Sequence, residues 1–65
     1  MHIRELRFIN RMSQYDLWLA TKIPQSKISL IENGYTRPTT AELERLALVF
    51  NIAPDKIQFS KKAHG

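Results

Sequence analysis

The stretch that decides the fold is residues 12–34, which read MSQYDLWLATKIPQSKISLIENG. Ser13 suits a helix N-cap because its hydroxyl can accept a hydrogen bond from a free backbone N–H of the first turn. Asp16 lies three residues later, in a weak form of the capping box, and its charge suits a helix N-terminus. We therefore predict a helix from Gln14 to about Thr21, with one buried face made of Leu17, Trp18 and Thr21.

Pro24 prevents this helix from continuing, because proline lacks a backbone N–H and disfavours helical backbone at the preceding residue. Proline is well tolerated at the start of a helix, so a second helix is expected from near Pro24 or Gln25 to Asn33. Gly34 can adopt the left-handed conformation that ends it. Ile28 and Ile31 are spaced to point inward. The residues left facing outward are Gln25, Ser26, Lys27, Ser29 and Leu30.

Helical patterns also flank this stretch. We predict a first helix from His2 to about Asn10, with an inner stripe of Ile3, Leu6 and Asn10 and with Arg7 beside it. Thr39 and Glu42 have the spacing of a full capping box and predict a helix with an inner stripe of Leu43, Leu46, Ala47 and Phe50. Three features follow it: a left-handed Asn51, an inward Ile52 and a short turn of helix over residues 54–57.

Length and composition limit the possibilities. The 65 residues allow one domain, for which we take residues 1–59, with residues 60–65 as a disordered tail. Cysteine is absent, so no disulfide or thiolate metal site can stabilise the chain. No apolar run reaches the roughly 20 residues of a membrane span, and the N-terminus lacks the apolar core of a signal peptide. We therefore expect a cytoplasmic protein without a membrane partner.

The formal net charge of +4 is compatible with a polyanionic partner, although many small domains are mildly basic. Catalytic chemistry has little support. His2 and His64 lie at opposite ends of the chain, and Asp16 and Glu42 are better explained as helix caps. No pattern of paired carboxylates, nucleophile and base, or metal ligands is present, so we expect no enzyme, no cofactor and no metal site.

The chain resembles the helix-turn-helix of phage repressor and Cro-type regulators, the XRE family, over roughly residues 3–58. The resemblance implies an all-α, compact bundle of four to five short helices of the lambda repressor-like type, with the helix-turn-helix at residues 14–33. Two positions depart from the family pattern, because the family usually has a small residue at Trp18 and often glycine at Lys22. The residues that carry the resemblance are Ser13, Gln14, Leu17, Ile23, Gln25, Ser26, Ile28, Ser29, Ile31–Gly34, Arg37, Pro38, Leu43, Leu46, Ala47, Phe50 and Ile52.

This resemblance implies a sequence-specific regulator of transcription, for which we expect a repressor, that reads double-stranded DNA with the second helix of the motif. Glutamine can pair with adenine, lysine can donate to guanine or to a phosphate, and leucine can contact a thymine methyl group. The implied base-reading residues are Gln25, Ser26, Lys27 and Leu30. We expect phosphate contacts at Gln14, Asn33, Tyr35 and Arg37, with Arg11 equally able to be solvated.

The resemblance also implies an ion pair between Arg7 and Glu32. The residue pattern agrees, because an arginine on the core side of a short helix needs a carboxylate and Glu32 flanks the buried Ile28 and Ile31. The alternative is two separately solvated charges.

Apolar residues exceed what the core of five short helices needs. The candidates for exposure are Phe8, Ile9, Tyr15, Leu19, Leu48, Val49 and Phe59. Because this family often dimerises near its C-terminal end, we predict a homodimer through Leu48, Val49, Ile57 and Phe59. The alternative function is an antitoxin or another helix-turn-helix module whose main partner is a protein, such as a toxin.

Overall fold

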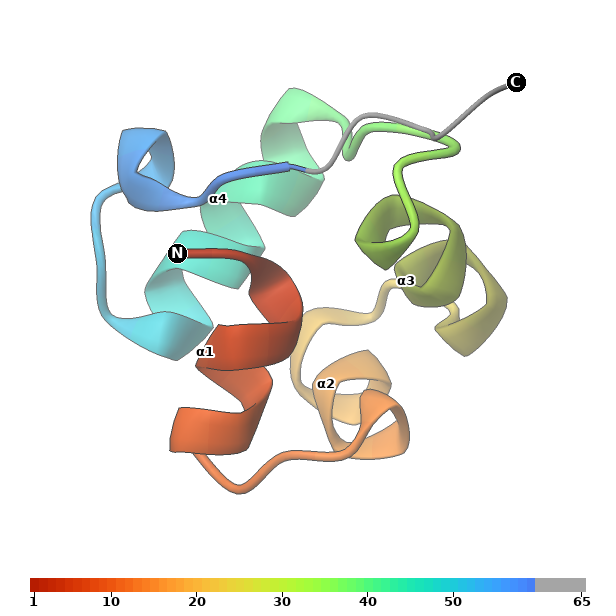
Figure 1. Cartoon of the computed structure of the whole chain (residues 1–65), viewed down its shortest axis with the longest axis horizontal. Coiled ribbons are helices and arrows are strands. Elements are labelled where there is room, and N and C mark those ends of the chain that lie inside the picture. The colour runs from red at the N-terminus through yellow and green to blue at the C-terminus, as the bar shows by residue number, and fades with distance from the viewer. Residues whose placement is uncertain (60–65) are drawn as a thin grey trace.

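The computed structural model describes residues 1–59 and contains four α-helices and one short 3₁₀-helix in this part of the chain (Figure 1). The elements are α1 (Ile3–Ile9), α2 (Gln14–Thr21), α3 (Gln25–Glu32), α4 (Thr40–Phe50) and η1 (Pro54–Lys56). This confirms the predicted all-α bundle and its helix-turn-helix, in which α2 packs against both α3 and α4. The tail expected over residues 60–65 lies outside the described residues.

The helices begin where the capping residues predicted. Ser13 Oγ accepts a hydrogen bond from the Asp16 N–H, and the Asp16 carboxylate accepts one from the Ser13 N–H. Thr39 and Glu42 make the same reciprocal pair at the start of α4. Each pair provides side-chain acceptors for two backbone N–H groups that the start of a helix leaves without partners. These hydrogen bonds also lower the pKa of the Asp16 carboxyl below its usual value.

A left-handed residue follows the end of every α-helix. At the end of α3, the N–H groups of Gly34 and Tyr35 return to the carbonyls of Ile31 and Leu30, which satisfies two of the last free acceptors. The four left-handed residues are Arg11, Lys22, Gly34 and Asn51, with φ of 56°, 66°, 80° and 56°. Three of the four are therefore not glycine, and they bear the steric cost that glycine avoids.

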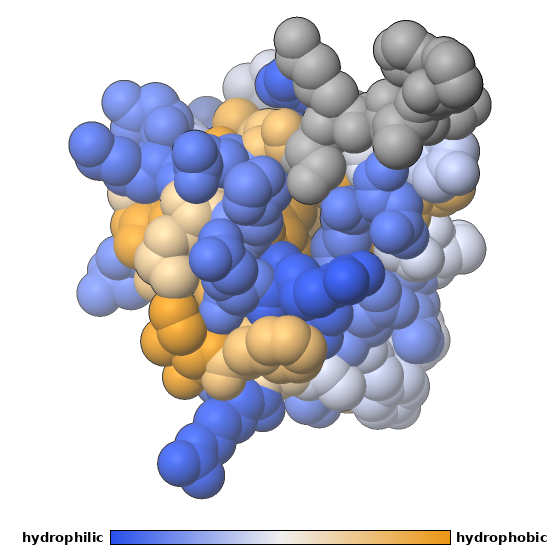
Figure 2. Space-filling model, in the orientation of Figure 1, coloured by the Kyte–Doolittle hydropathy of each residue, from blue (hydrophilic) through white to orange (hydrophobic). Residues whose placement is uncertain are grey.

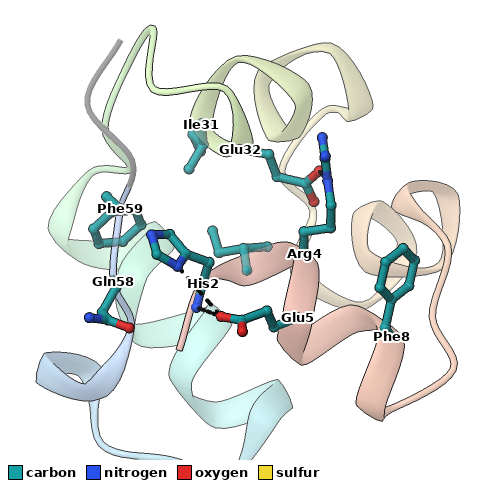
Figure 3. A pocket seen from close by; sticks show the side chains of 9 residues that line it. His2, Arg4, Glu5, Phe8, Ile31, Glu32, Gln58 and Phe59 are labelled. Atoms are coloured by element: carbon teal, nitrogen blue, oxygen red, sulfur yellow. Dashed lines mark hydrogen bonds and ion pairs between the residues drawn. The ribbon is translucent and has the colours of Figure 1, made fainter. Parts of the chain in front are cut away.

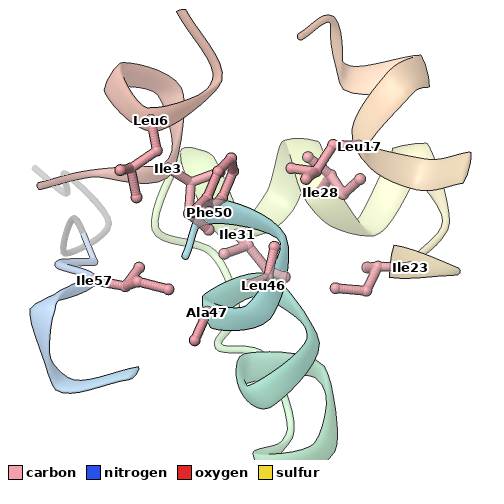
Figure 4. Packing of buried hydrophobic residues seen from close by; sticks show 10 residues of the cluster. All are labelled: Ile3, Leu6, Leu17, Ile23, Ile28, Ile31, Leu46, Ala47, Phe50 and Ile57. Carbon is pink, nitrogen blue, oxygen red and sulfur yellow. The ribbon is translucent and has the colours of Figure 1, made fainter. Parts of the chain in front are cut away.

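The core lies where the four α-helices meet the C-terminal segment (Figure 4). Ile23, in the corner between α2 and α3, is fully buried and fixes that corner to the core. The C-terminal segment returns beside the N-terminus, where the Gln58 N–H donates to the Met1 carbonyl at 2.8 Å. The buried apolar residues are Ile3, Leu6, Leu17, Ile23, Ile28, Ile31, Leu46, Ala47, Phe50 and Ile57.

Three predicted core or surface positions were wrong. Trp18 is 38% exposed rather than buried, because Leu17 and Thr21 fill the inner side of α2. Its ring meets the Tyr15 ring edge to face, with centroids 5.3 Å apart, so it neither enters the helix seam nor separates the helices. Asn10 is exposed because α1 ends at Ile9, and its side chain caps the Leu6 carbonyl. Ile57, predicted at a dimer surface, is buried in the core.

The surplus apolar residues mostly lie on the surface, as predicted. Five of the seven candidates are exposed, whereas Val49 and Phe59 are partly buried against the core. Within residues 1–59, no helix is both long and apolar enough to cross a bilayer.

The strained corner gives a stability prediction. Replacing Lys22 with glycine should raise the free energy of unfolding by about 0.5 kcal/mol. The left-handed conformation costs a non-glycine residue about 1 kcal/mol, and the greater entropy of unfolded glycine offsets part of this gain. Urea titration followed by circular dichroism measures the change. Asn51→Gly is the matched control and should gain less, because asparagine tolerates this conformation. A loss of stability in Lys22→Gly would contradict the prediction.

Candidate functional site

α3 presents a polar surface opposite its buried anchors. Ile28 and Ile31 are buried, and they fix the rotation of the helix about its axis. Gln25, Ser26 and Leu30 are consequently exposed, as the sequence predicted for the outward side of this helix. The exposed surface of α3 therefore offers an amide, a hydroxyl and an isobutyl group, all uncharged.

Lys27 is held differently from its neighbours. Its ammonium nitrogen lies 2.8 Å from Glu42 Oε1, and the two side chains are only 30% and 14% exposed. The same carboxylate accepts the Thr39 N–H at 2.9 Å in the capping box of α4. The hydrogen bond from Lys27 is the main cause that lowers the pKa of the Glu42 carboxyl below its usual value. Lys27 is therefore paired with a carboxylate of its own chain, that of Glu42.

A second side chain of α4, that of Arg45, contacts α2, the other helix of the motif. Arg45 Nη1 donates to the Thr21 carbonyl, the last residue of α2, at 2.9 Å. Arg45 follows Glu42 by three residues, so both side chains leave the same side of α4. One helix face thereby holds α3 near its start and α2 at its end. The spacing of Glu42 and Arg45 was visible in the sequence, but their partners depend on tertiary packing.

Glu32 is the centre of a charged cluster at the C-terminal end of α3. Arg7 Nε donates to Glu32 Oε2 at 2.6 Å, and Arg7 Nη2 donates to Oε1 at 3.1 Å. Gln14 Nε2 also donates to Oε1 at 3.1 Å, and Arg4 Nε lies 3.7 Å away. The Glu32 side chain is only 1% exposed, and Arg7 is almost as deeply buried. The cluster therefore joins α1, α2 and α3.

Two members of this cluster were not anticipated. Gln14 was expected to point outward, toward a phosphate, because nothing in the sequence seemed to need a glutamine there. The structure shows an internal contact as well, because the Gln14 amide donates to Glu32 Oε1 and so joins the start of α2 to the end of α3. Arg4 was not singled out, and Figure 3 shows its guanidinium beside the Glu32 carboxylate.

The other candidate phosphate contacts lie on separate parts of the surface. Asn33 is exposed, and its side-chain amide donates to the Ser29 carbonyl at 2.8 Å. Arg11 and Tyr35 are exposed in the segments that follow α1 and α3. Arg37 is also exposed, and its guanidinium carbon lies 5.1 Å from the centroid of the Phe59 ring. This contact orients Arg37 without neutralising its charge.

A hollow of about 260 Å³ lies between α1, the end of α3 and the C-terminal segment (Figure 3). It does not include the exposed residues of α3 named above. Its lining consists of His2, Ile3, Arg4, Glu5, Phe8, Ile31, Glu32, Gln58 and Phe59. Among residues 1–59, no three side chains of the metal-binding types His, Cys, Asp or Glu are grouped as a metal site would need.

Comparison with known proteins gives one match. A family model described as helix-turn-helix matches residues 3–57, which include all four α-helices and η1. No curated protein and no solved structure matches the chain.

The buried cluster predicts strong coupling between Arg7 and Glu32. Arg7→Met and Glu32→Gln should each lower the free energy of unfolding by about 3 kcal/mol, because each leaves a buried group without its partner. Together they should cost clearly less than the sum of the two. Urea titration of the four proteins gives the coupling energy. Arg4→Met is the control and should cost at most about 1 kcal/mol, since Arg4 is largely exposed. Additive losses at Arg7 and Glu32 would contradict the coupling.

Proposed function

Because the chain belongs to the Cro/C1-type helix-turn-helix family of DNA-binding regulators, we propose that it binds double-stranded DNA sequence-specifically through α3. The observation that carries this proposal is the exposed polar surface of α3, fixed in rotation by Ile28 and Ile31 and fixed in position by contacts to α1, α2 and α4. In this family of folds the second helix of the motif enters the major groove with its N-terminal residues toward the base edges.

The side chains near the start of α3 have groups suited to base edges. Gln25 can bind adenine in the bidentate manner of amide side chains, in which its N–H donates to adenine N7 and its carbonyl oxygen accepts from the adenine N6 amino group. Ser26 can donate or accept and is less selective. Leu30 can contact a thymine methyl group. Lys27 belongs to the same stretch of helix but would first have to leave Glu42.

Phosphate contacts would fix the position of the protein on the duplex without reading sequence. We assign them to Arg11, Asn33, Tyr35 and Arg37, together with the start of α2, where free backbone N–H groups favour an anion. Gln14 lies at the start of α2, where its amide donates to Glu32 Oε1. A phosphate contact from Gln14 would have to form in addition to this hydrogen bond. A few such contacts give weak binding that falls steeply with salt.

Dimerisation would supply the missing affinity. Leu48 is 82% exposed on α4, and a shallow hollow beside it is lined by Glu44, Ala47, Asn51 and residues 52–54. Figure 2 shows hydrophobic residues gathered on the left of this view, where Figure 1 places the N-terminus and α1 in front of the end of α4. We propose a homodimer through the end of α4 and the C-terminal segment, with Leu48 at its centre and with contributions from the partly buried Val49 and Phe59.

A two-fold dimer would read two half-sites about one helical turn, roughly 34 Å, apart. Its operator would therefore be short and nearly palindromic. When such an operator overlaps a promoter, the bound dimer excludes RNA polymerase, which makes the protein a repressor.

A protein partner, such as a toxin, is the second candidate function. The observation that favours it is a set of large exposed apolar residues on α1 and α2 that the proposed DNA and dimer surfaces do not use. These residues are Phe8, Ile9, Tyr15, Trp18 and Leu19. Exposed aromatic residues are common at the centres of protein interfaces.

The proposed function predicts a clear preference among duplexes. The protein should bind the DNA upstream of its own gene about 1,000-fold more tightly than a scrambled duplex at physiological salt, within the usual range for specific regulators. Gln25→Ala should lose about tenfold of the discrimination at one base pair in each half-site. Fluorescence anisotropy measures both effects. Gln58→Ala, a matched exposed glutamine outside α3, should keep the discrimination. Equal binding to both duplexes that disappears with salt would contradict specific recognition.

The proposed dimer predicts concentration-dependent sedimentation. The protein should sediment as a dimer at tens of micromolar, and Leu48→Glu should convert it to a monomer, because a charge would be buried at the centre of the interface. Leu19→Glu is the matched control on α2 and should remain dimeric. A native protein that stays monomeric over this concentration range would contradict the dimer.

A further inference from the structure

We infer that Lys27 is a positioning residue that Glu42 keeps off the DNA, so that only uncharged side chains of α3 read the bases. This inference rests on the proposed function and deepens it, because it limits the class of base pairs that α3 can recognise. Lys27 is the one basic residue of α3, and it lies between the proposed reader Ser26 and the buried anchor Ile28.

The geometry of the pair favours retention of the ion pair over exchange for a DNA contact. Lys27 Nζ and Glu42 Oε1 are 2.8 Å apart, and both side chains are partly buried. The Glu42 carboxylate is also held by its own capping hydrogen bond, because Oε1 accepts the Thr39 N–H at 2.9 Å, and this opposes its movement after a departing lysine. If Lys27 turned to the DNA, it would leave an unneutralised carboxylate close to a surface that faces phosphates. Like charges repel, so an unpaired Glu42 carboxylate near the phosphates would oppose binding.

The pair also has a mechanical consequence. Glu42 holds the first turn of α3 through Lys27, while Arg45, one turn further along α4, holds the end of α2 through the Thr21 carbonyl. The two helices of the motif are thus attached to a single face of α4. Lys27 acts through this attachment, because it sets where Gln25 and Ser26 stand relative to the groove.

The base pairs that α3 can recognise depend on its exposed side chains other than Lys27. Lysine and arginine make the commonest contacts to guanine, whereas glutamine suits adenine and leucine suits the thymine methyl group. With Lys27 bound to Glu42, the exposed reading groups of α3 are those of Gln25, Ser26 and Leu30. We therefore expect the base pairs under the start of α3 to be A·T rather than G·C pairs.

The test compares Lys27→Met, Glu42→Gln and the double variant. Glutamine at position 42 keeps the capping box, because a glutamine side chain can also accept the Thr39 N–H, but it removes the charge that binds Lys27. A preferred duplex is first selected from a random pool with the native protein. The slope of log binding constant against log salt is then measured on that duplex and on an unrelated one. Lys56→Met, an exposed residue of η1, controls for the loss of one positive charge.

We expect Lys27→Met to keep the native slope, as Lys56→Met does, because neither change removes a DNA contact. Unlike Lys56→Met, it should weaken binding to the selected duplex, because the start of α3 loses its attachment to α4 and the Glu42 charge is left unpaired. Glu42→Gln should free Lys27, so that the slope becomes steeper by up to about 0.9, the value of one added phosphate contact. The double variant should return to the native slope. In urea titrations, the two single changes should show coupling of roughly two- to fivefold in the unfolding equilibrium constant, as expected for a partly exposed pair.

Two results would overturn the inference. The first is a slope about 0.9 shallower, or a lost guanine preference, in Lys27→Met but not in Lys56→Met, since Lys27 would then contact the DNA in the native protein. The second is an unchanged slope in Glu42→Gln, because Glu42 would not be what withholds Lys27. A native protein that selects no preferred duplex would contradict the proposed function instead. The salt slopes on the unrelated duplex would still decide the role of Lys27.

Discussion

The buried carboxylate of Glu32 is the constraint on which the rest of the structure depends. A charge that is 1% exposed is stable only when charged and polar partners surround it, and here they come from two other helices. Arg7 holds it from α1 and Gln14 holds it from the start of α2. The angle between the two helices of the motif is thus set by a polar contact that tolerates little displacement, in addition to the apolar core.

Side chains of α4 hold the opposite ends of the two helices that the Glu32 cluster joins. The Glu32 cluster joins the start of α2 to the end of α3, whereas Arg45 and Glu42 attach the end of α2 and the start of α3 to α4. Both ends of the helix-turn-helix are therefore held. A small domain without disulfides needs such contacts, because its core alone contributes little beyond the entropy lost on folding. α3 is therefore attached to its neighbouring helices at both of its ends.

Trp18 and Lys22, the two departures from the family pattern, are each accommodated by their own side-chain or backbone conformation. Trp18 turns outward against Tyr15, so that a large residue occupies a surface position where the inner side of α2 is already filled. Lys22 adopts the left-handed conformation that glycine would adopt at lower cost, and Ile23 remains buried after it. The corner thus places Ile23 in the core, and we expect the steric cost of the left-handed lysine to lower the free energy of unfolding.

The sequence by itself determined the elements of this protein. Ser13 and Thr39 begin helices, Pro24 separates two of them, Gly34 and Asn51 follow helix ends, and the spacing of Ile28 and Ile31 selects the exposed side of α3. These are local effects of hydrogen bonding, backbone sterics and periodicity, which act within a few residues. Only the tertiary structure decided the partners of the long polar side chains. Gln14 turns inward to Glu32, and Lys27 pairs with Glu42. Ile57 is buried rather than exposed. Periodicity and capping leave such residues a choice between solvent and a distant partner, and packing makes that choice by fixing which groups lie within hydrogen-bonding distance.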